Sequence, residues 1–331
     1  MNIVLFTVLL AIYCSTANVI LRYSNSADEF SQKNARVVNY GISKHSLFER
    51  KLNSRDGRSK CSAPKRGPGI AERSLVVSFD NSTIDRRMKL PTPENIAKYI
   101  RDETNEAEPV VWGVRDTNAA KTEYDVNTSL FEEYKFYQND DGLSLSATHL
   151  TGCTMLAIIS RKGIWIGHFW ENIAFSIDKT NQFWERYKKD QDKIFEETVI
   201  KGMRNGKGSG ENKQQDSLRL AAPKLDDDHI KAYLVHPSSN WEENGDYRGY
   251  WDRMKAEAVT HIPKLGQSDR WVEQAYVPTS NKRTLRYTPR GTLLFKYDAK
   301  HRSETSSEGA SGTQQLAMLW SETTELHRDA W

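Results

Sequence analysis

The sequence predicts an α+β fold, with a central, mostly antiparallel β-sheet or β-sandwich core flanked by helices. Short runs rich in β-branched and aromatic residues alternate irregularly with amphipathic segments, in an order that allows antiparallel hairpins. The most hydrophobic internal block, 150–169, is apolar on both faces when it is placed on two strands, as expected for strands in the middle of a fold. The chain has 331 residues, 37% of them hydrophobic, which is enough for a sizeable core.

The first residues are typical of a secretory signal peptide. An apolar run over 3–13 is too short to span a bilayer, and small residues follow it up to Ala17. We therefore expect a signal peptide over 1–17 and a secreted, extracellular protein with no membrane attachment after signal cleavage. Glycosylation motifs at Asn81 and Asn127 are consistent with this route and predict surface loops there.

The segment from 18 to about 69 is typical of a propeptide or disordered arm, because it is rich in Ser, Asn, Lys and Arg. Its dibasic pair Lys65-Arg66 lies beside Pro and Gly and is a candidate processing site. We expect a single α+β domain over 70–331, with a flexible Gly/Ser-rich insertion at about 204–218.

Local patterns predict the elements of this domain in order. Thr92 and Pro93 fit the N-cap and the first position of a helix, and an aromatic stripe along 178–203 indicates a second, long helix. A third helix is expected at 250–259, and 129–137 is either a helical turn or a strand. Strands are predicted at 75–79, 110–114, 154–159, 164–170, 230–235, 271–277, 292–297 and 315–320.

Residues 154–170 are predicted to form a β-hairpin with its turn centred on 161–162. Cys153 and His168 are separated by an odd number of positions, so an even-length turn places both side chains on one face. Cys153 is then paired with Trp170, and His168 is its diagonal neighbour, roughly 7 Å away. A cysteine beside a histidine can act as a nucleophile with its base. Both residue types also occur in cores without any catalytic role.

The motif Leu-Thr-Gly-Cys at 150–153, with His168 on the next strand, resembles the Leu-Ser-Gly-Cys motif of the cytotoxic necrotizing factor family of toxins. Those toxins are glutamine deamidases acting on Rho GTPases, and they share a Cys–His fold with bacterial chemoreceptor deamidases. The resemblance covers 148–171. It implies that Cys153 is the nucleophile, that His168 is the base, and that the partner is a protein presenting a glutamine side chain.

A second resemblance covers more of the chain. Four segments are similar to a set of secreted fungal proteins of unassigned function: Gly152-Cys153-Thr154, His168-Phe169-Trp170-Glu171, Val235-His236-Pro237 and 290–298. This resemblance implies secretion and supplies no activity.

The residues and the first resemblance predict a secreted Cys–His amidohydrolase, a protein glutamine deamidase that works through a thioester. Cys153 attacks the carboxamide, and His168 accepts the thiol proton and then protonates the departing ammonia. Backbone N–H groups at Gly152 and Cys153 would hold the oxyanion. An amine in place of water would give transglutamination, and no metal or cofactor is required.

The third catalytic residue stays open. Some of the deamidases carry a threonine before the cysteine that orients the histidine, and here Thr148 is the candidate, although its register is shifted. Ser146 and Thr151 are alternatives. His149 is interpreted as a loop residue, because the spacing of His168 already fits the hairpin.

The alternative function is a catalytically silent secreted effector or wall-associated binding protein, in which Cys153 and His168 are core residues. A disulfide between Cys61 and Cys153 would favour it, because no thiol would remain. The net charge is only +3 and no basic stripe is present, so no nucleic-acid partner is expected. The side chains of 226–229 (Asp-Asp-Asp-His) are consecutive, unlike the spaced ligands of hard-cation sites, so no metal site is expected there.

Overall fold

A computed structural model describes the fold of most of the second half of the chain and part of the first. The described residues are 88–109, 127–138, 142–177, 179, 182–208, 214–238, 247–302 and 313–331. The expected signal peptide, the arm, the dibasic pair and the strands at 75–79 and 110–114 lie outside these residues and stay predictions. No helix among the described residues combines the length and the apolar character needed to cross a bilayer.

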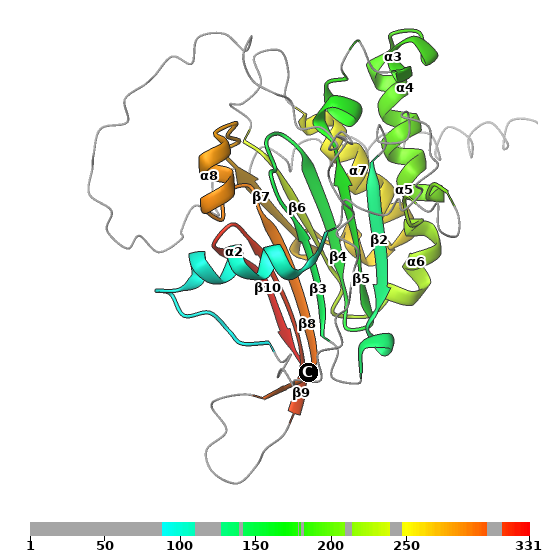
Figure 1. Cartoon of the computed structure of the whole chain (residues 1–331). Helices are drawn as coiled ribbons and strands as arrows, with labels where there is room; N and C mark the ends of the chain where they lie inside the picture. The colour runs from blue at the N-terminus through cyan, green and yellow to red at the C-terminus, as the bar shows by residue number, and fades with distance from the viewer. Residues whose placement is uncertain are drawn as a thin grey trace, which may run out of the picture. The chain divides into compact units, whose positions relative to one another are not determined.

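The described residues form an α+β fold built on two five-stranded sheets, which confirms the predicted class (Figure 1). The strands are β1 Glu108–Pro109, β2 Thr128–Glu133, β3 Leu143–Ala147, β4 Thr154–Ile159, β5 Gly163–Phe169, β6 Lys231–Pro237, β7 Trp271–Tyr276, β8 Leu293–Arg302, β9 Thr313–Ser321 and β10 Thr324–Ala330. One sheet has the order β1-β3-β8-β9-β10, and the other has the order β2-β5-β4-β6-β7. Among the described strands, β1 pairs with β3 and β6 with β7 in parallel, and the other pairs are antiparallel.

Helices flank the two sheets, and some of them cover the outer faces. They are α2 Ile96–Glu106, η2 Tyr134–Tyr137, η3 Glu171–Phe175, α3 Gln182–Arg186, α4 Gln191–Phe195, η4 Glu196–Ile200, α5 Lys201–Asn205, α6 Leu218–Leu225, α7 Arg248–His261, η7 Pro263–Gly266, η8 Ser268–Arg270 and α8 Lys282–Tyr287. Figure 1 shows α4 to α7 on the side of the second sheet and α2 on the side of the first.

The core is arranged in three apolar layers. The inner layer lies between the sheets, where Leu145 and Phe295 of the first sheet share a cluster with Met155 and Tyr233 of the second. A second layer joins the outer face of the second sheet to its helices, and a third joins α2 to the first sheet. The strands β4 and β5 therefore have apolar neighbours on both faces, which explains why their sequence is hydrophobic throughout.

The hairpin predicted over 154–170 is present as β4 and β5, at the centre of the second sheet. Thr154 pairs with Phe169 and Met155 pairs with His168, so the turn has the predicted register. On their other edges, β5 pairs with β2 and β4 pairs with β6. The hairpin is thus enclosed by strands as well as by apolar layers.

The long helix expected over 178–203 is interrupted. Lys188 and Lys189 have φ values of 57° and 64°, and this left-handed backbone separates α3 from the helical run that follows. The carboxylate of Asp190 accepts a hydrogen bond from the backbone N–H of Lys193 and caps that run, which continues from α4 through the π-helix η4 into α5.

The predicted start of the first helix is also shifted. The side-chain oxygen of Asn95 accepts a hydrogen bond from the backbone N–H of Thr92, and α2 begins only at Ile96. The strands β3 and β10 and the helices α6 and α8 carry weaker local patterns, and the sequence analysis did not foresee them.

One expectation about a surface loop also differs from the structure. Asn127 is buried, and its side chain bonds to the backbone of Thr198 and of Trp170, so a glycan cannot be attached there in this fold. Within the expected insertion at 204–218, Lys207 and Gln215 form an antiparallel bridge.

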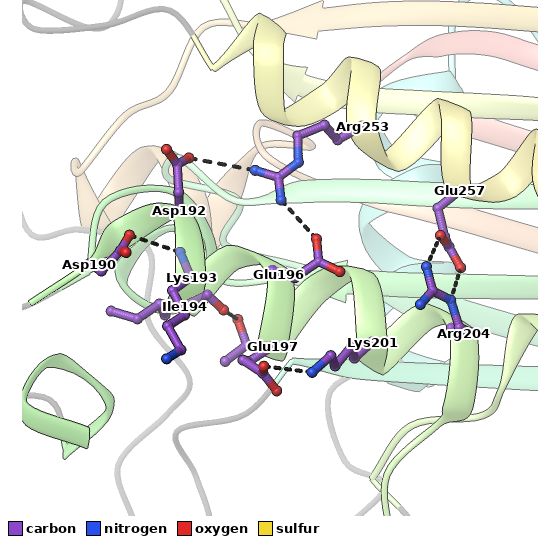
Figure 2. Close-up of polar contacts among 11 residues, drawn as sticks. Asp190, Asp192, Lys193, Ile194, Glu196, Glu197, Lys201, Arg204, Arg253 and Glu257 are labelled. Carbon is purple, nitrogen blue, oxygen red and sulfur yellow. Dashed lines mark hydrogen bonds and ion pairs between the residues drawn. The ribbon is translucent and has the colours of Figure 1, made fainter. Parts of the chain in front are cut away.

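Ion pairs join the run from α4 to α5 to the neighbouring helix α7 (Figure 2). Arg253 of α7 pairs with Asp192 at 3.5 Å and with Glu196 at 2.8 Å. Closer to the end of the run, both carboxylate oxygens of the buried Glu257 accept hydrogen bonds from Arg204, at 2.7 and 2.9 Å. A two-bond guanidinium–carboxylate pair fixes orientation as well as distance, so it sets the rotation of α7 against α5.

The close approach of β2 to β5 gives a testable consequence at Gly163. A Cβ atom there would clash with the backbone oxygen of Glu132 on β2. We expect Gly163→Ala to lower the free energy of unfolding by about 1–3 kcal/mol, because neither backbone can move without breaking the ladder. The measurement is urea denaturation. The matched control is Gly249→Ala, where a Cβ meets nothing within 4 Å, and an equal loss in both variants would contradict this account.

Candidate active site

The structure places Cys153 and His168 on the same face of the second sheet, as the odd spacing predicted. His168 pairs with Met155 across the hairpin, so Cys153 lies opposite Trp170, two residues further along each strand. Met155 and Trp170 both belong to the inner apolar layer. The two candidate catalytic residues therefore face the space between the two sheets, as diagonal neighbours in the hairpin register.

His168 is an unusual core residue because its hydrogen-bonding capacity is unused. Its exposed fraction is 0%, and among the described residues neither ring nitrogen has a hydrogen-bond partner. The ring stacks on Trp170, with the ring centroids 3.8 Å apart. Burial lowers the pKa of His168 to about 3, so the imidazole is neutral at physiological pH.

Cys153 is also fully buried, and in this structure it takes part in a disulfide bond. The other two cysteines of the chain, Cys14 and Cys61, lie outside the described residues. In this state the sulfur of Cys153 carries no proton and cannot act as a nucleophile. Reduction of the disulfide is therefore a condition for any thiol chemistry at this position.

The backbone around Cys153 is fixed by a tyrosine of the edge strand β7. The hydroxyl of Tyr276 accepts a hydrogen bond from the Gly152 N–H at 3.0 Å and donates one to the Cys153 carbonyl at 2.7 Å. Gly152 has a φ of 152°, a region that favours glycine. The Gly152 N–H, which we expected to bind the oxyanion, thus already donates a hydrogen bond to the Tyr276 hydroxyl. That hydrogen bond would have to break before this N–H could bind a substrate oxygen.

Among the described residues, no hydrogen bond joins Thr148 to His168. The Thr148 hydroxyl lies 2.9 Å from Nδ1 of His149, whose backbone has a φ of 60°. His149 is exposed, which agrees with its interpretation as a loop residue. The pair belongs to the loop that leads into β4.

A different threonine, Thr128, lies where a residue orienting His168 would be placed. Thr128 is the direct cross-strand partner of His168 in the β2–β5 ladder, so the two side chains share a face. Its exposed fraction is 5%, and its hydroxyl has no hydrogen-bond partner among the described residues. The neighbouring Asn127 accepts a hydrogen bond from the Trp170 N–H at 3.0 Å and holds the end of β5 against β2.

Sequence reasoning missed Thr128 because its position depends on strand pairing. The pattern over 129–137 fits a helical turn as well as a strand, and no local pattern shows which residue of an edge strand lies opposite His168. The apolar residue Leu130, two positions later, packs on the inner layer. That alternation could have indicated the inward face of the strand.

The acidic run at 226–229 is tied to neighbouring groups of the surface. Lys264 pairs with Asp226 and Asp228 at 3.1 and 3.0 Å, and Asp227 accepts a hydrogen bond from the Arg161 N–H. In the part of the chain that the structure describes, no group of three or more His, Cys, Asp or Glu residues is arranged to hold a metal ion.

Comparisons with known proteins add little to this geometry. No family model matches the chain, and no curated protein matches it. Among solved structures, the C-terminal domain of CNFy from Yersinia pseudotuberculosis matches with a TM-score of 0.24 and 8% identity, over 61% of this chain and 58% of that one. A likeness of this size carries no argument about activity. The comparisons do not support the resemblance to secreted fungal proteins.

The unpaired state of His168 predicts how stability depends on pH. Its pKa of about 3 in the fold lies below the ordinary value of 6.5. The unfolded chain therefore binds the proton first, and the protein loses stability as the pH falls from about 6.5 toward 3. About two pH units below 6.5, the loss from this group should be roughly 2–3 kcal/mol. His168→Phe should remove that loss and cost little stability at neutral pH, because no hydrogen bond is broken.

His327→Phe is the matched control, measured by urea denaturation across the same pH range. His327 is also buried, with a pKa lowered to about 4, but its Nδ1 lies 2.5 Å from the Tyr233 hydroxyl. The control should therefore lose about 1–3 kcal/mol at neutral pH, because a buried hydroxyl is left without its partner. If His168→Phe is equally damaging at neutral pH, His168 has a structural partner and this account is wrong.

Proposed function

We propose that this protein is a cysteine amidohydrolase that deamidates a glutamine side chain of a protein substrate. In this proposal Cys153 is the nucleophile once its disulfide is reduced, His168 is the general base, and Thr128 orients His168. The proposal differs from the sequence analysis in its third residue, Thr128 instead of Thr148.

The unpaired imidazole of His168 is the observation that carries the proposal. Buried polar groups are nearly always hydrogen-bonded, and an unsatisfied one costs about 1–3 kcal/mol. A histidine kept only for packing would be expected to have a partner or to be replaced by an apolar residue. Within the described part of the chain, both nitrogens of His168 lack partners, on the same face as a cysteine and opposite a threonine hydroxyl that also lacks one.

The proposed reaction uses a thiol at Cys153 and a water molecule. As the sulfur bonds to the carboxamide carbon, the thiol proton passes to His168, which then gives it to the departing ammonia. Water attacks the resulting thioester with His168 again as the base, and glutamate and the thiol are released. Because burial opposes a standing thiolate–imidazolium pair, we expect proton transfer to accompany the attack on the carboxamide.

Thiol–disulfide exchange would switch the enzyme on. A dithiol reductant is oxidised to its disulfide while the disulfide at Cys153 is reduced to two thiols. The expected signal peptide would carry the chain through an oxidising compartment, where the disulfide persists. Activity would then begin only where a reductant is present.

A second candidate function is a catalytically silent binding protein, and the disulfide at Cys153 favours it. In that case the bond is permanent, and the sulfur only cross-links the fold. The two candidates differ in whether reduction produces an activity, so one experiment separates them.

Reduction is expected to start ammonia release. The purified protein, treated with a dithiol and then freed of excess reductant, is incubated with a glutamine-rich protein such as casein. Ammonia is measured with a coupled assay, and the glutamine-to-glutamate conversion is located by mass spectrometry. Cys153→Ser should abolish the release, and His168→Gln should lower it by about 100-fold or more, since general base catalysis typically contributes 10²–10⁴-fold.

The untreated protein serves as the oxidised control. It should release no ammonia, because its sulfur is blocked. Equal rates from the reduced wild type and from reduced Cys153→Ser would leave the binding protein as the remaining candidate.

Thr128→Val tests whether Thr128 positions His168. The change keeps the shape of the side chain and removes its hydroxyl, so the fold should be unaffected. In the described structure Thr128 and His168 are not hydrogen-bonded to each other, so the orienting bond would form in the substrate complex, and its loss should lower kcat by about tenfold. The reduced variant should also shift the acidic limb of its pH–rate profile, because no hydroxyl is then available to bind one ring nitrogen of His168 during the reaction. Thr128→Ser should restore most of the rate, and an unchanged profile in Thr128→Val would exclude this role.

A further inference from the structure

The short helix α8 lies against the loop that leads to Cys153. The N–H of Leu150 donates a hydrogen bond to the carbonyl of Gly291 at 2.9 Å. Gly291 has a φ of 64°, and a Cβ there would lie 2.9 Å from the Leu150 oxygen and 3.3 Å from a methyl group of Leu285. Leu285 is the buried residue of α8. The segment 276–291 therefore contacts the loop before Cys153 twice, through Tyr276 at its start and Gly291 at its end. Figure 1 shows α8, which lies between these contacts in sequence, beside β7.

The solvent face of α8 is cationic. Lys282, Arg283, Arg286 and Tyr287 are all exposed, and positions 282, 283, 286 and 287 share one side of a helix. Leu285 points in the opposite direction, into the fold. The segment 277–291 contains four basic residues and no acidic residue.

This charge is not neutralised within the described structure. Arg290 is paired with Glu322, but no carboxylate of the described residues forms an ion pair with Lys282, Arg283 or Arg286. Lys282 and Arg286 are four positions apart, and Arg283 and Arg286 are three apart, spacings at which like charges destabilise a helix. Among the described residues, three cations on a short helix thus have no ion-pair partner, and their mutual repulsion lowers helix stability.

Apolar surface accompanies the cations. Val277 is 59% exposed and Tyr287 is 58% exposed, among the largest values for hydrophobic residues of the described chain. The guanidinium of Arg286 lies over the Tyr287 ring, at 5.4 Å from its centroid. Two guanidinium groups suit the planar geometry of carboxylates, and a single aromatic ring offers no stacking platform for successive bases.

We propose that the α8 patch, formed by Lys282, Arg283, Arg286 and Tyr287, is the docking surface for an acidic segment of the substrate protein. This inference rests on the proposed function and names the class of its substrate. An acidic segment with one apolar side chain would bind on α8 and direct a neighbouring glutamine toward the loop at 150–153. Selectivity for the substrate would then come from α8, outside the buried catalytic pair.

The test measures peptide binding and deamidation separately. Two labelled peptides contain one central glutamine and one leucine, and they differ only in having glutamates or serines around them. Affinity for the reduced protein is measured by fluorescence anisotropy, and ammonia release is measured in parallel. We expect the acidic peptide to bind about tenfold more tightly at low ionic strength than the neutral one, with the difference reduced at about 0.15 M salt.

The triple variant Lys282→Gln, Arg283→Gln, Arg286→Gln should abolish that difference. Its fold should be preserved, because the substitutions relieve repulsion within α8. The matched control, Lys188→Gln, Lys189→Gln, Lys193→Gln, removes the same charge from exposed positions elsewhere and should keep the wild-type preference.

Equal affinity for the two peptides, or an unchanged preference in the α8 triple variant, would overturn the α8 proposal whatever the ammonia assay shows. Loss of the preference only in the α8 variant, with no ammonia release from any peptide, would support the docking surface and refute the deamidase. A further arm uses a single-stranded oligonucleotide and vesicles of anionic lipid. If either binds the α8 patch more tightly than the acidic peptide does, the partner is not an acidic protein segment.

Discussion

The burial of the β4–β5 hairpin between two apolar layers is the constraint on which the rest of the structure depends. Its inner face packs on the opposite sheet and its outer face packs on helices, so every residue of both strands is inside the protein. Because burial of apolar surface contributes about 25 cal/mol per Å², the burial of this hairpin is a main source of the free energy of folding. It also fixes the two strands so firmly that side chains on them cannot exchange faces.

Because of this burial, polar groups in and beside the hairpin lower the stability of the fold. His168, Thr128 and the indole nitrogen of Trp170 all lie in or beside the inner layer without hydrogen-bond partners among the described residues. Each such group lowers stability by about 1–3 kcal/mol. His168 and Trp170 share the sheet face of Cys153, and buried polar groups without partners at such a place agree with the proposed site.

The surroundings of Cys153 come from one continuous stretch of chain. Tyr276 at the end of β7 binds both sides of the Gly152–Cys153 peptide, and Gly291 binds Leu150. Between these contacts the chain forms α8, whose buried Leu285 faces Gly291 and whose cations face solvent. The backbone that holds Cys153, the proposed nucleophile, is therefore joined by one segment to the surface proposed to bind the substrate, and the disulfide at Cys153 adds a redox-sensitive restraint at the same point.

The sequence by itself determined the fold class, the hairpin and the shared face of Cys153 and His168, because strand alternation and turn length are local properties. It could not determine which residue faces His168, because Thr128 reaches that position through pairing with β5, far along the chain. Nor could it show that Asn127 is buried, that α3 and α4 are separate, or that Tyr276 binds at Gly152. The tertiary structure decided these points, because the register of an edge strand and the partners of a buried polar group depend on the simultaneous packing of both sheets.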